Sequence, residues 1–452
     1  MLKRSLVLFL VIAAAWRGES GNTFDTGRLV DVKADLSTLE FVTTIFRHGD
    51  RTPVALMPTD KANDEESWII GLGELTKEGM AQQYRLGQWI RKRYDSFIST
   101  EYSSYEIYAR SSDYNRTLMS GQANLAGLFK PTNHTTQFLP GLLWNPIPVH
   151  TLPKEDDRQL YDEVECPILH HEIDRVYSED PQVLQLEKEN ADFLSFLGNN
   201  SGLAKDTLRL KDMWLVFDSL NAEYCHQDEH QIPGWVNSTV WSKIQSLYDQ
   251  SSRFLHSNDL LKKLKSGPLL QEISRRLRLK AANQLDSRHK YYMYSAHDTS
   301  VSAILAAFGI IPETFPNYAT MAMIELHRSQ DDHIIKIFYK NVTDGENVYE
   351  YDIERCPSPC SLTSFMASTE IYIPKAWKVD CGIVKWYEWD PSTYFALIAM
   401  LAFCAFFFAS LIGIECGLRY FNKKQATTAN RNDSREEGDD TAPLINDSSE
   451  EV

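Results

Sequence analysis

The alternation of apolar and polar positions predicts an α/β fold, in which strands and helices follow one another along the chain. Runs of β-branched and aromatic residues at 39–46, 106–109 and 291–296 are typical of strands. Residues 76–94 instead repeat apolar positions along one side, as an amphipathic helix does, and Thr76 is a suitable N-cap. We therefore expect one sheet with helices packed on it.

Two more helices are expected directly after strands. Ser111 or Ser112 is placed to cap a helix that runs to about Phe129. Another helix is expected over 299–308, closed by Gly309 in a C′ position.

A long helical stretch separates the second and third of these strands. Residues 151–290 are dominated by polar and helical segments, and the segment 260–279 is predicted to break at Gly267-Pro268, since glycine and proline together disfavour a continuous helix. We expect this stretch to cover the sheet as a cap.

Further strands are expected after the third helix. The runs at 322–326 and 334–339 are predicted to be antiparallel strands at the sheet edge. The predicted fold class is thus α/β, with a central mixed sheet flanked by helices and a smaller, mainly α-helical cap.

The start of the chain is typical of a cleaved secretory signal. Lys3 and Arg4 precede an apolar run over 5–15, which is too short to span a bilayer comfortably. A retained N-terminal anchor is the alternative.

A second apolar segment lies near the other end. The uncharged stretch 394–414, of about 21 residues, can cross a hydrocarbon core as one helix. Acidic Glu388 and Asp390 precede it, and basic Arg419 and Lys423 follow, which places the C-terminus in the cytoplasm. A buried core helix is the alternative. These ends predict a single-pass type I membrane protein.

The chain is therefore expected to contain four segments. They are a signal peptide at 1–19, a lumenal body at 20–392 (α/β core about 38–150 and 288–385, helical cap about 151–287), a transmembrane helix at 393–414 and a cytoplasmic tail at 415–452.

The net charge of −16 argues against a nucleic-acid-binding protein, which needs a basic face. An anionic substrate would have to be attracted by a local cationic pocket. No zinc-spaced Cys or His cluster and no acidic EF-hand loop occurs in the sequence, so we expect no metal and no other cofactor.

The strongest chemical signal is Arg-His-Gly-Asp-Arg-Thr-Pro at 47–53, directly after the first strand. Gly49 lets the backbone approach a ligand closely, and Pro53 prevents the strand from continuing. Two guanidinium groups beside an imidazole suit a dianion such as phosphate. A surface turn with scattered charges is the alternative.

The second and third strands also end in functional groups, Arg110 and His297-Asp298. Alone, an arginine after a strand is usually a solvated terminus, and a His-Asp pair often only caps a helix. Ligands bind in open α/β sheets at the carboxyl ends of strands, so three such ends favour a site.

These motifs resemble the histidine acid phosphatase family, in the branch of the lysosomal and prostatic acid phosphatases. The resemblance rests on residues 47–53, 108–113, 146–150 and 295–298, and it covers roughly 38–385. It implies a phosphoglycerate mutase-like sandwich with a helical cap, and a homodimer, since family members are often dimers.

The resemblance also implies a role for each matching residue. His48 is expected to be the nucleophile that forms a phosphohistidine, and Asp298 the general acid that protonates the leaving group. The groups expected to bind the phosphoryl oxygens are Arg47, Arg51, Arg110 and His297.

Five cysteines fall in the expected lumenal body, where disulfides persist. The resemblance implies the pairs Cys166–Cys381 and Cys356–Cys360. Cys225 is then left over, because the family position of its partner holds no cysteine here. We expect a free buried thiol or an intermolecular link.

Short motifs fit passage through the secretory pathway. The tail over 423–452 is polar, acidic and expected to be disordered. Within it, Asp440, Leu444 and Ile445 resemble an acidic dileucine signal that a sorting adaptor would bind. The expected N-glycosylation sites are Asn133, Asn199, Asn237 and Asn341.

The sequence thus predicts an acid phosphatase that hydrolyses small phosphate monoesters at acidic pH, at the lysosomal or endosomal membrane or the cell surface. A more selective lysophospholipid or inositol phosphate phosphatase is an alternative, since the signature does not set specificity. A receptor-like phosphate-binding protein without turnover is another, which the intact His48 and Asp298 oppose. A mutase-type transferase is disfavoured by the secretory features.

Overall fold

The computed structural model describes residues 27–133, 135–161, 164–204, 207–330, 332–383 and 391–433. The chain divides into two units, Met1–Ile383 and Val384–Val452. The expected signal peptide and the tail residues Asp440, Leu444 and Ile445 lie outside the described residues.

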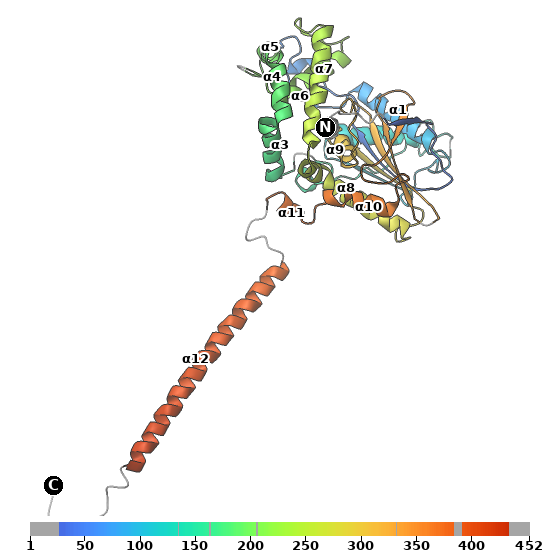
Figure 1. The fold of residues 1–452 in the computed structure, drawn as a ribbon. Coiled ribbons are helices and arrows are strands. Elements are labelled where there is room, and N and C mark those ends of the chain that lie inside the picture. The colour runs from blue at the N-terminus through green and yellow to red at the C-terminus, as the bar shows by residue number, and fades with distance from the viewer. Residues whose placement is uncertain are drawn as a thin grey trace, which may run out of the picture. The chain divides into compact units, whose positions relative to one another are not determined.

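A seven-stranded mixed sheet forms the centre of the first unit, in the order β1-β7-β6-β5-β2-β4-β3 (Figure 1). β2 (Leu39–Arg47) runs parallel to β4 (Tyr291–Ala296), and β4 runs parallel to β3 (Ile107–Ser111). β5 (Met321–His327) lies antiparallel to β2, and β6 (Ile334–Lys340) lies antiparallel to β5. The three strands with predicted site residues are therefore neighbours.

Two short strands extend the sheet beyond β6. β7 (Val348–Tyr351) pairs with β6, and β1 (Arg28–Val30) pairs with β7. The prediction that β5 and β6 lie at the edge was therefore wrong, although they are antiparallel as expected. Strands of three and four residues are too short to give a recognisable periodicity.

Helices α8, α9 and α10 cover one face of the sheet. Phe41 and Ile45 of β2 point to this face and share an apolar cluster with residues of the three helices. The helices are α8 (Asp259–Ala281), α9 (Asp298–Ala307) and α10 (Leu362–Thr369).

Helices α1 (Lys77–Arg93) and α2 (Asn115–Leu128) cover the other face, where they pack on Val42 and Phe46. α1 begins after Thr76, whose side chain accepts a hydrogen bond from the backbone of the first turn, as predicted. β2 is thus buried on both faces, which explains why its residues are almost all buried and do not alternate strictly between apolar and polar.

The start of α2 differs from the prediction. β3 continues to Ser111, and α2 begins at Asn115 without a side-chain cap, so neither Ser111 nor Ser112 caps it. The hydroxyl of Ser112 instead lies 2.9 Å from Nε2 of His297. Packing of the strand end therefore outweighs the capping preference of serine.

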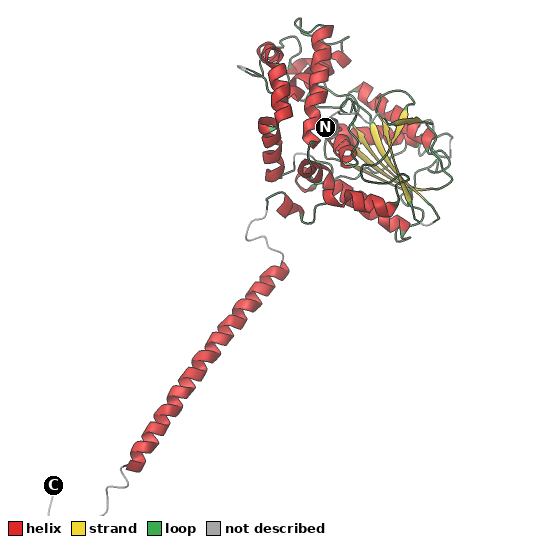
Figure 2. Cartoon of the chain, viewed as in Figure 1, coloured by secondary structure: helices red, strands yellow, loops and turns green. Residues whose placement is uncertain are grey.

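The region 151–287 is mainly helical, as predicted (Figure 2). It supplies most of a further apolar cluster, to which Met57, Trp377 and Cys381 also belong. Besides α8, its α-helices are α3 (Pro167–Glu179), α4 (Pro181–Glu189), α5 (Ala191–Ser201), α6 (Met213–Cys225) and α7 (Ser238–Arg253).

The predicted break at Gly267-Pro268 was wrong, because α8 runs through both residues. Leu264 packs in the cluster of the helical region, whereas Ile273 packs in the cluster that contains Phe41 and Ile45 of the sheet. Burial at both ends stabilises the helix beyond the cost of one backbone hydrogen bond lost at a proline. Glycine is required here because a Cβ would clash with the carbonyl oxygen of Tyr372.

Two disulfides lie in the first unit, in the pairs that the resemblance implied. Cys166 and Cys381 are 215 residues apart, whereas Cys356 and Cys360 are only 4 apart. Cys225 has no disulfide partner, but it is exposed, so the expectation of a buried thiol was wrong. It is the last residue of α6.

We expect the two disulfides to differ in their effect on stability. Loss of Cys166–Cys381 should lower the free energy of unfolding by about 5 kcal/mol, and loss of Cys356–Cys360 by about 2 kcal/mol, because the entropy of the unfolded chain rises with the length of the opened loop. Urea unfolding of C166S/C381S and C356S/C360S would measure the two free energies of unfolding. The variants are matched, because each replaces two cysteines by serines and opens one disulfide. Equal losses would contradict the loop-length explanation.

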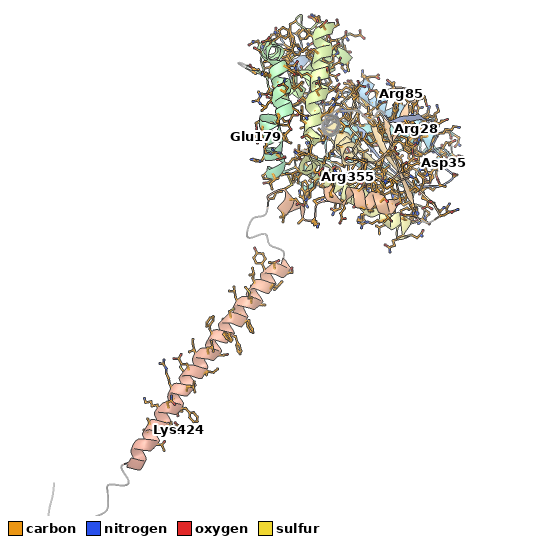
Figure 3. The ribbon with its side chains drawn as sticks, in the orientation of Figure 1. Arg28, Asp35, Arg85, Glu179, Arg355 and Lys424 are labelled. Atoms are coloured by element: carbon orange, nitrogen blue, oxygen red, sulfur yellow. A yellow bond between two sulfur atoms is a disulfide. The ribbon has the colours of Figure 1, made fainter. Side chains whose placement is uncertain are left out.

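The second unit contains α12 (Pro391–Asp433). Its segment Ser392–Thr428 is long and apolar enough to cross a membrane, and none of its most apolar window is buried, in contrast to a core helix. Side chains, Lys424 among them, point outward along this helix (Figure 3). The helix continues beyond the predicted disordered boundary at 423, because lysine, glutamine and alanine favour helix.

Candidate active site

The carboxyl ends of β2, β4 and β3 bring the predicted site residues together. Arg47 pairs in register with Ala296, so His48 and His297 follow neighbouring strands at the same level. The backbone N–H of His48 donates to the carbonyl of Ala296 at 3.0 Å, and the two imidazole centres are 5.7 Å apart. Arg110 lies in β3, the next strand.

His48 is buried, with 2% of its surface exposed. Its Nδ1 lies 2.8 Å from the carbonyl oxygen of Gly49. A carbonyl can only accept, so Nδ1 carries the hydrogen and the Nε2 lone pair is available. This tautomer suits an imidazole that attacks phosphorus.

The surroundings of His48 keep its imidazole neutral. Burial lowers the pKa of His48 well below 6.5, and the positive charges of Arg47, Arg116 and Arg51 lower it further. An exposed histidine is protonated in acid, and its ring then has no free lone pair. The lowered pKa of His48 therefore leaves a lone pair free on its ring at pH values where an exposed histidine is protonated.

Arg47 is held from three sides. Its Nη1 donates to the carbonyl of Pro316 at 2.8 Å, and its Nη2 lies 2.9 Å from Oδ2 of Asp298. Its guanidinium carbon lies 4.4 Å from the centre of the Tyr318 ring. These contacts fix the guanidinium plane, which a bidentate contact with phosphate requires.

Arg51 is paired with a residue of the helical region. Its Nη2 donates to Oδ1 of Asp218 in α6 at 2.6 Å, and both side chains are largely buried. The other oxygen of Asp218 accepts from the backbone N–H of Val54 at 2.8 Å. One carboxylate thus orients both the arginine and the chain that follows it.

Arg110 also has a carboxylate partner outside the sheet. Its Nη2 donates to Oδ1 of Asp157 at 2.5 Å, and its Nη1 contacts Gln159. Asp157 is fully buried, and the same oxygen accepts from the backbone N–H groups of Gln159 and Leu160.

Asp298 and His297 occupy the start of α9. The Oδ1 of Asp298 accepts from the backbone N–H of Thr299 at 2.8 Å, and 19% of the Asp298 side chain is exposed. The Nε2 of His297 faces the hydroxyl of Ser112, which also contacts Thr117 at 3.0 Å. Asp298 is therefore more accessible than the arginines.

Asp50, in the middle of the motif, has a structural role. Its carboxylate accepts from the hydroxyl of Thr76 and lies 2.7 Å from Nε2 of His226, whose pKa this hydrogen bond raises. A Cβ on Gly49 would clash with the backbone of Gly79 in α1. The motif is thus fixed to α1 and to the end of α6.

Sequence reasoning missed several groups of the site. Asp157 and Asp218 belong to the helical region, and no local pattern connects them with the arginines they bind. Arg116 lies in α2, six positions after Arg110, and its placement in a predicted helix just after a cationic strand end was an available signal. Tyr318, below Arg47, has no sequence signal.

The predicted glycosylation sites differ in exposure. Asn133, Asn199 and Asn237 are exposed, whereas Asn341 is partly buried and its Oδ1 atom is inaccessible to solvent. Use of the first three sites stays a prediction, and Asn341 is the least accessible acceptor.

Comparison with known families and proteins agrees with this geometry. Residues 38–340 match the profile of the family described as "Histidine phosphatase superfamily (branch 2)". "Putative acid phosphatase 5" of Caenorhabditis elegans is 37% identical over 441 residues, 97% of this chain and 99% of that protein. Human lysosomal acid phosphatase is 36% identical, over 77% of this chain and 81% of that protein. Human prostatic acid phosphatase is 37% identical, over 76% of this chain and 88% of that protein.

Solved structures share the fold at much lower identity. The phytase from Citrobacter braakii has a TM-score of 0.55 at 16% identity, over 76% of this chain and 99% of that one. Hafnia alvei phytase in complex with myo-inositol hexakis sulphate has a TM-score of 0.56 at 14% identity, over 76% of this chain and 98% of that one.

Proposed function

Because the chain belongs to the histidine phosphatase superfamily (branch 2), we propose that it hydrolyses phosphate monoesters through a phosphohistidine formed on His48. The chain is an acid phosphatase, since acid phosphatases at 36% to 37% identity cover between 76% and 97% of it. The mechanism is supported by one observation above all. The imidazole of His48 is buried, and the nearby charges of Arg47, Arg116 and Arg51 favour its neutral form.

In the first step, the Nε2 lone pair of His48 forms a bond to phosphorus while the bond from phosphorus to the ester oxygen breaks. Protonated Asp298 gives its proton to that oxygen, so an alcohol leaves. Fixed cations stabilise the charge on the phosphoryl oxygens. The proposed binding groups are Arg47, Arg51, Arg110 and His297.

In the second step, water attacks the phosphohistidine. The Asp298 carboxylate takes a proton from that water as the new oxygen–phosphorus bond forms, and the bond between phosphorus and Nε2 breaks. Inorganic phosphate leaves, and both residues return to their initial protonation states.

We further propose that the protein is a type I membrane protein with its catalytic unit in an acidic lumen, at the lysosomal or endosomal membrane or at the cell surface. The apolar α12 and the similarity to lysosomal acid phosphatases support this. The helical region would act as a cap over the site. A homodimer and a sorting adaptor bound at Asp440, Leu444 and Ile445 remain predictions.

The pH dependence of hydrolysis tests the proposed function. We expect p-nitrophenyl phosphate to be hydrolysed fastest at acidic pH, because the proposed reaction needs Asp298 in its protonated form to give a proton to the leaving group. Rising pH removes this proton, so activity should fall towards neutrality. His48 should stay neutral when the pH falls below 6.5, the ordinary pKa of histidine, because burial lowers its pKa well below that value. A single optimum well above neutrality would contradict the proposal.

A further inference from the structure

We propose that Arg116 and Lys154, which both lie over the ring of Tyr114, form a second anion-binding subsite beside the phosphoryl site. It would select phosphate monoesters that carry a further phosphate or carboxylate group a few bonds from the scissile ester. This inference rests on the proposed phosphatase function, because it assigns a substrate class to the same site.

Arg116 and Lys154 both contact the ring of Tyr114. The guanidinium carbon of Arg116 lies 4.3 Å from the centre of the Tyr114 ring, and the Nζ of Lys154 lies 3.8 Å from it. Both distances fall within the range of a cation–π interaction. The ring of Tyr114 therefore contacts two positively charged side chains.

Tyr114 connects this pair of cations to the site. Its ring meets the ring of His297 edge to face, with centres 5.0 Å apart. The ring of His297 lies 5.7 Å from that of His48. The ring of His297 therefore lies between Tyr114 and His48, and a short substrate can reach from His48 to the second subsite.

Arg116 differs from the other arginines of the site in its partners. Arg47, Arg51 and Arg110 each form an ion pair with an aspartate. Within the described parts of the chain, neither Arg116 nor Lys154 forms an ion pair, and the Nε of Arg116 is buried without a hydrogen-bond partner. An anionic substituent would supply the missing counter-charge.

Electrostatics place Arg116 close to the reacting group. The charge of Arg116 lowers the pKa of His48. This effect is smaller than that of Arg47 and larger than that of Arg51. Burial lowers the pKa of Arg116 itself, and the charge of Arg51 adds to this effect. Like charges held this near one another are relieved by a bound anion.

Two substrates with the same three-carbon skeleton test the inference. Glycerol 3-phosphate is neutral at the end remote from the ester, whereas 3-phosphoglycerate has a carboxylate there. In R116Q and in K154Q, we expect kcat/KM for 3-phosphoglycerate to fall about tenfold to hundredfold more than for glycerol 3-phosphate, since a charge-assisted contact is lost. K154Q changes a partly exposed side chain and keeps the test valid if R116Q folds poorly.

Arg288 provides a matched control. Its guanidinium carbon lies 3.8 Å from the centre of the Tyr105 ring, so R288Q also removes an arginine stacked on a tyrosine. Arg288 and Tyr105 precede β4 and β3, at the opposite ends of these strands from the site. R288Q should leave the ratio of the two kcat/KM values unchanged.

The outcomes are distinct. An equal loss on both substrates in R116Q and K154Q would overturn the inference and place these residues in the phosphoryl site itself. An unchanged ratio in both variants would also overturn it. If the wild-type protein hydrolysed neither these substrates nor p-nitrophenyl phosphate, the proposed function would fail instead.

Discussion

Replacement of His48 by alanine is expected to reduce kcat for p-nitrophenyl phosphate by about four to six orders of magnitude, because the proposed covalent intermediate forms on the Nε2 of His48. The Nε2 of His48 is unprotonated and aimed away from the carbonyl of Gly49, which holds Nδ1. Rapid-quench labelling with ³²P-labelled substrate should trap phosphate on His48 in the wild type and on no residue in H48A.

His327 is a suitable control for the loss of a buried histidine. Both histidines have 2% of their surface exposed, but His327 pairs in register with Leu39, at the opposite end of β2 from His48. H327A should lose stability, because Glu325 and Thr38 each lose a hydrogen-bond partner, and it should retain phosphohistidine formation. Label on another side chain in the wild type, or full activity in H48A, would exclude His48 as nucleophile.

Replacement of Asp298 by alanine is expected to slow phosphoenzyme formation by about a thousandfold with glycerol 3-phosphate, and by much less with p-nitrophenyl phosphate. An alkoxide is a strong base and cannot leave without a proton, whereas nitrophenolate is a weak base that needs little assistance. Single-turnover kinetics with the two substrates would measure the difference.

The ion pair with Arg47 requires a second variant. D298A leaves Arg47 without its carboxylate partner, which should affect both substrates to the same degree. D298N keeps an acceptor for the backbone N–H of Thr299 and also lacks the proton to donate. If both variants slowed the two substrates equally, Asp298 would position Arg47 and would not be the general acid.

The local patterns predicted the parts of the site that depend on single strands. β2, β3 and β4 formed where β-branched and aromatic runs occur, and parallel pairing then brings Arg47, Arg110 and His297 to one edge. Recognising the three strands is enough to predict that these residues meet, because neighbouring parallel strands end at the same edge of the sheet.

The groups that orient these side chains could not be predicted, because they depend on contacts distant in sequence. Asp218 is 167 residues from Arg51, and Asp157 is 47 residues from Arg110. The same limitation explains α8, where burial in two clusters keeps Gly267 and Pro268 within one helix. Burial of this kind is a property of the folded chain and has no signature in a short window.

The ion pair between Arg51 and Asp218 limits how this enzyme can be re-engineered. A foreign helical insertion could be grafted onto the sheet to alter substrate preference. Here a graft that omits Asp218 would leave a buried guanidinium without its counter-charge and the N–H of Val54 without an acceptor. Any chimera must therefore carry an acidic residue at this point of α6, so the insertion and the sheet have to be exchanged as a matched set.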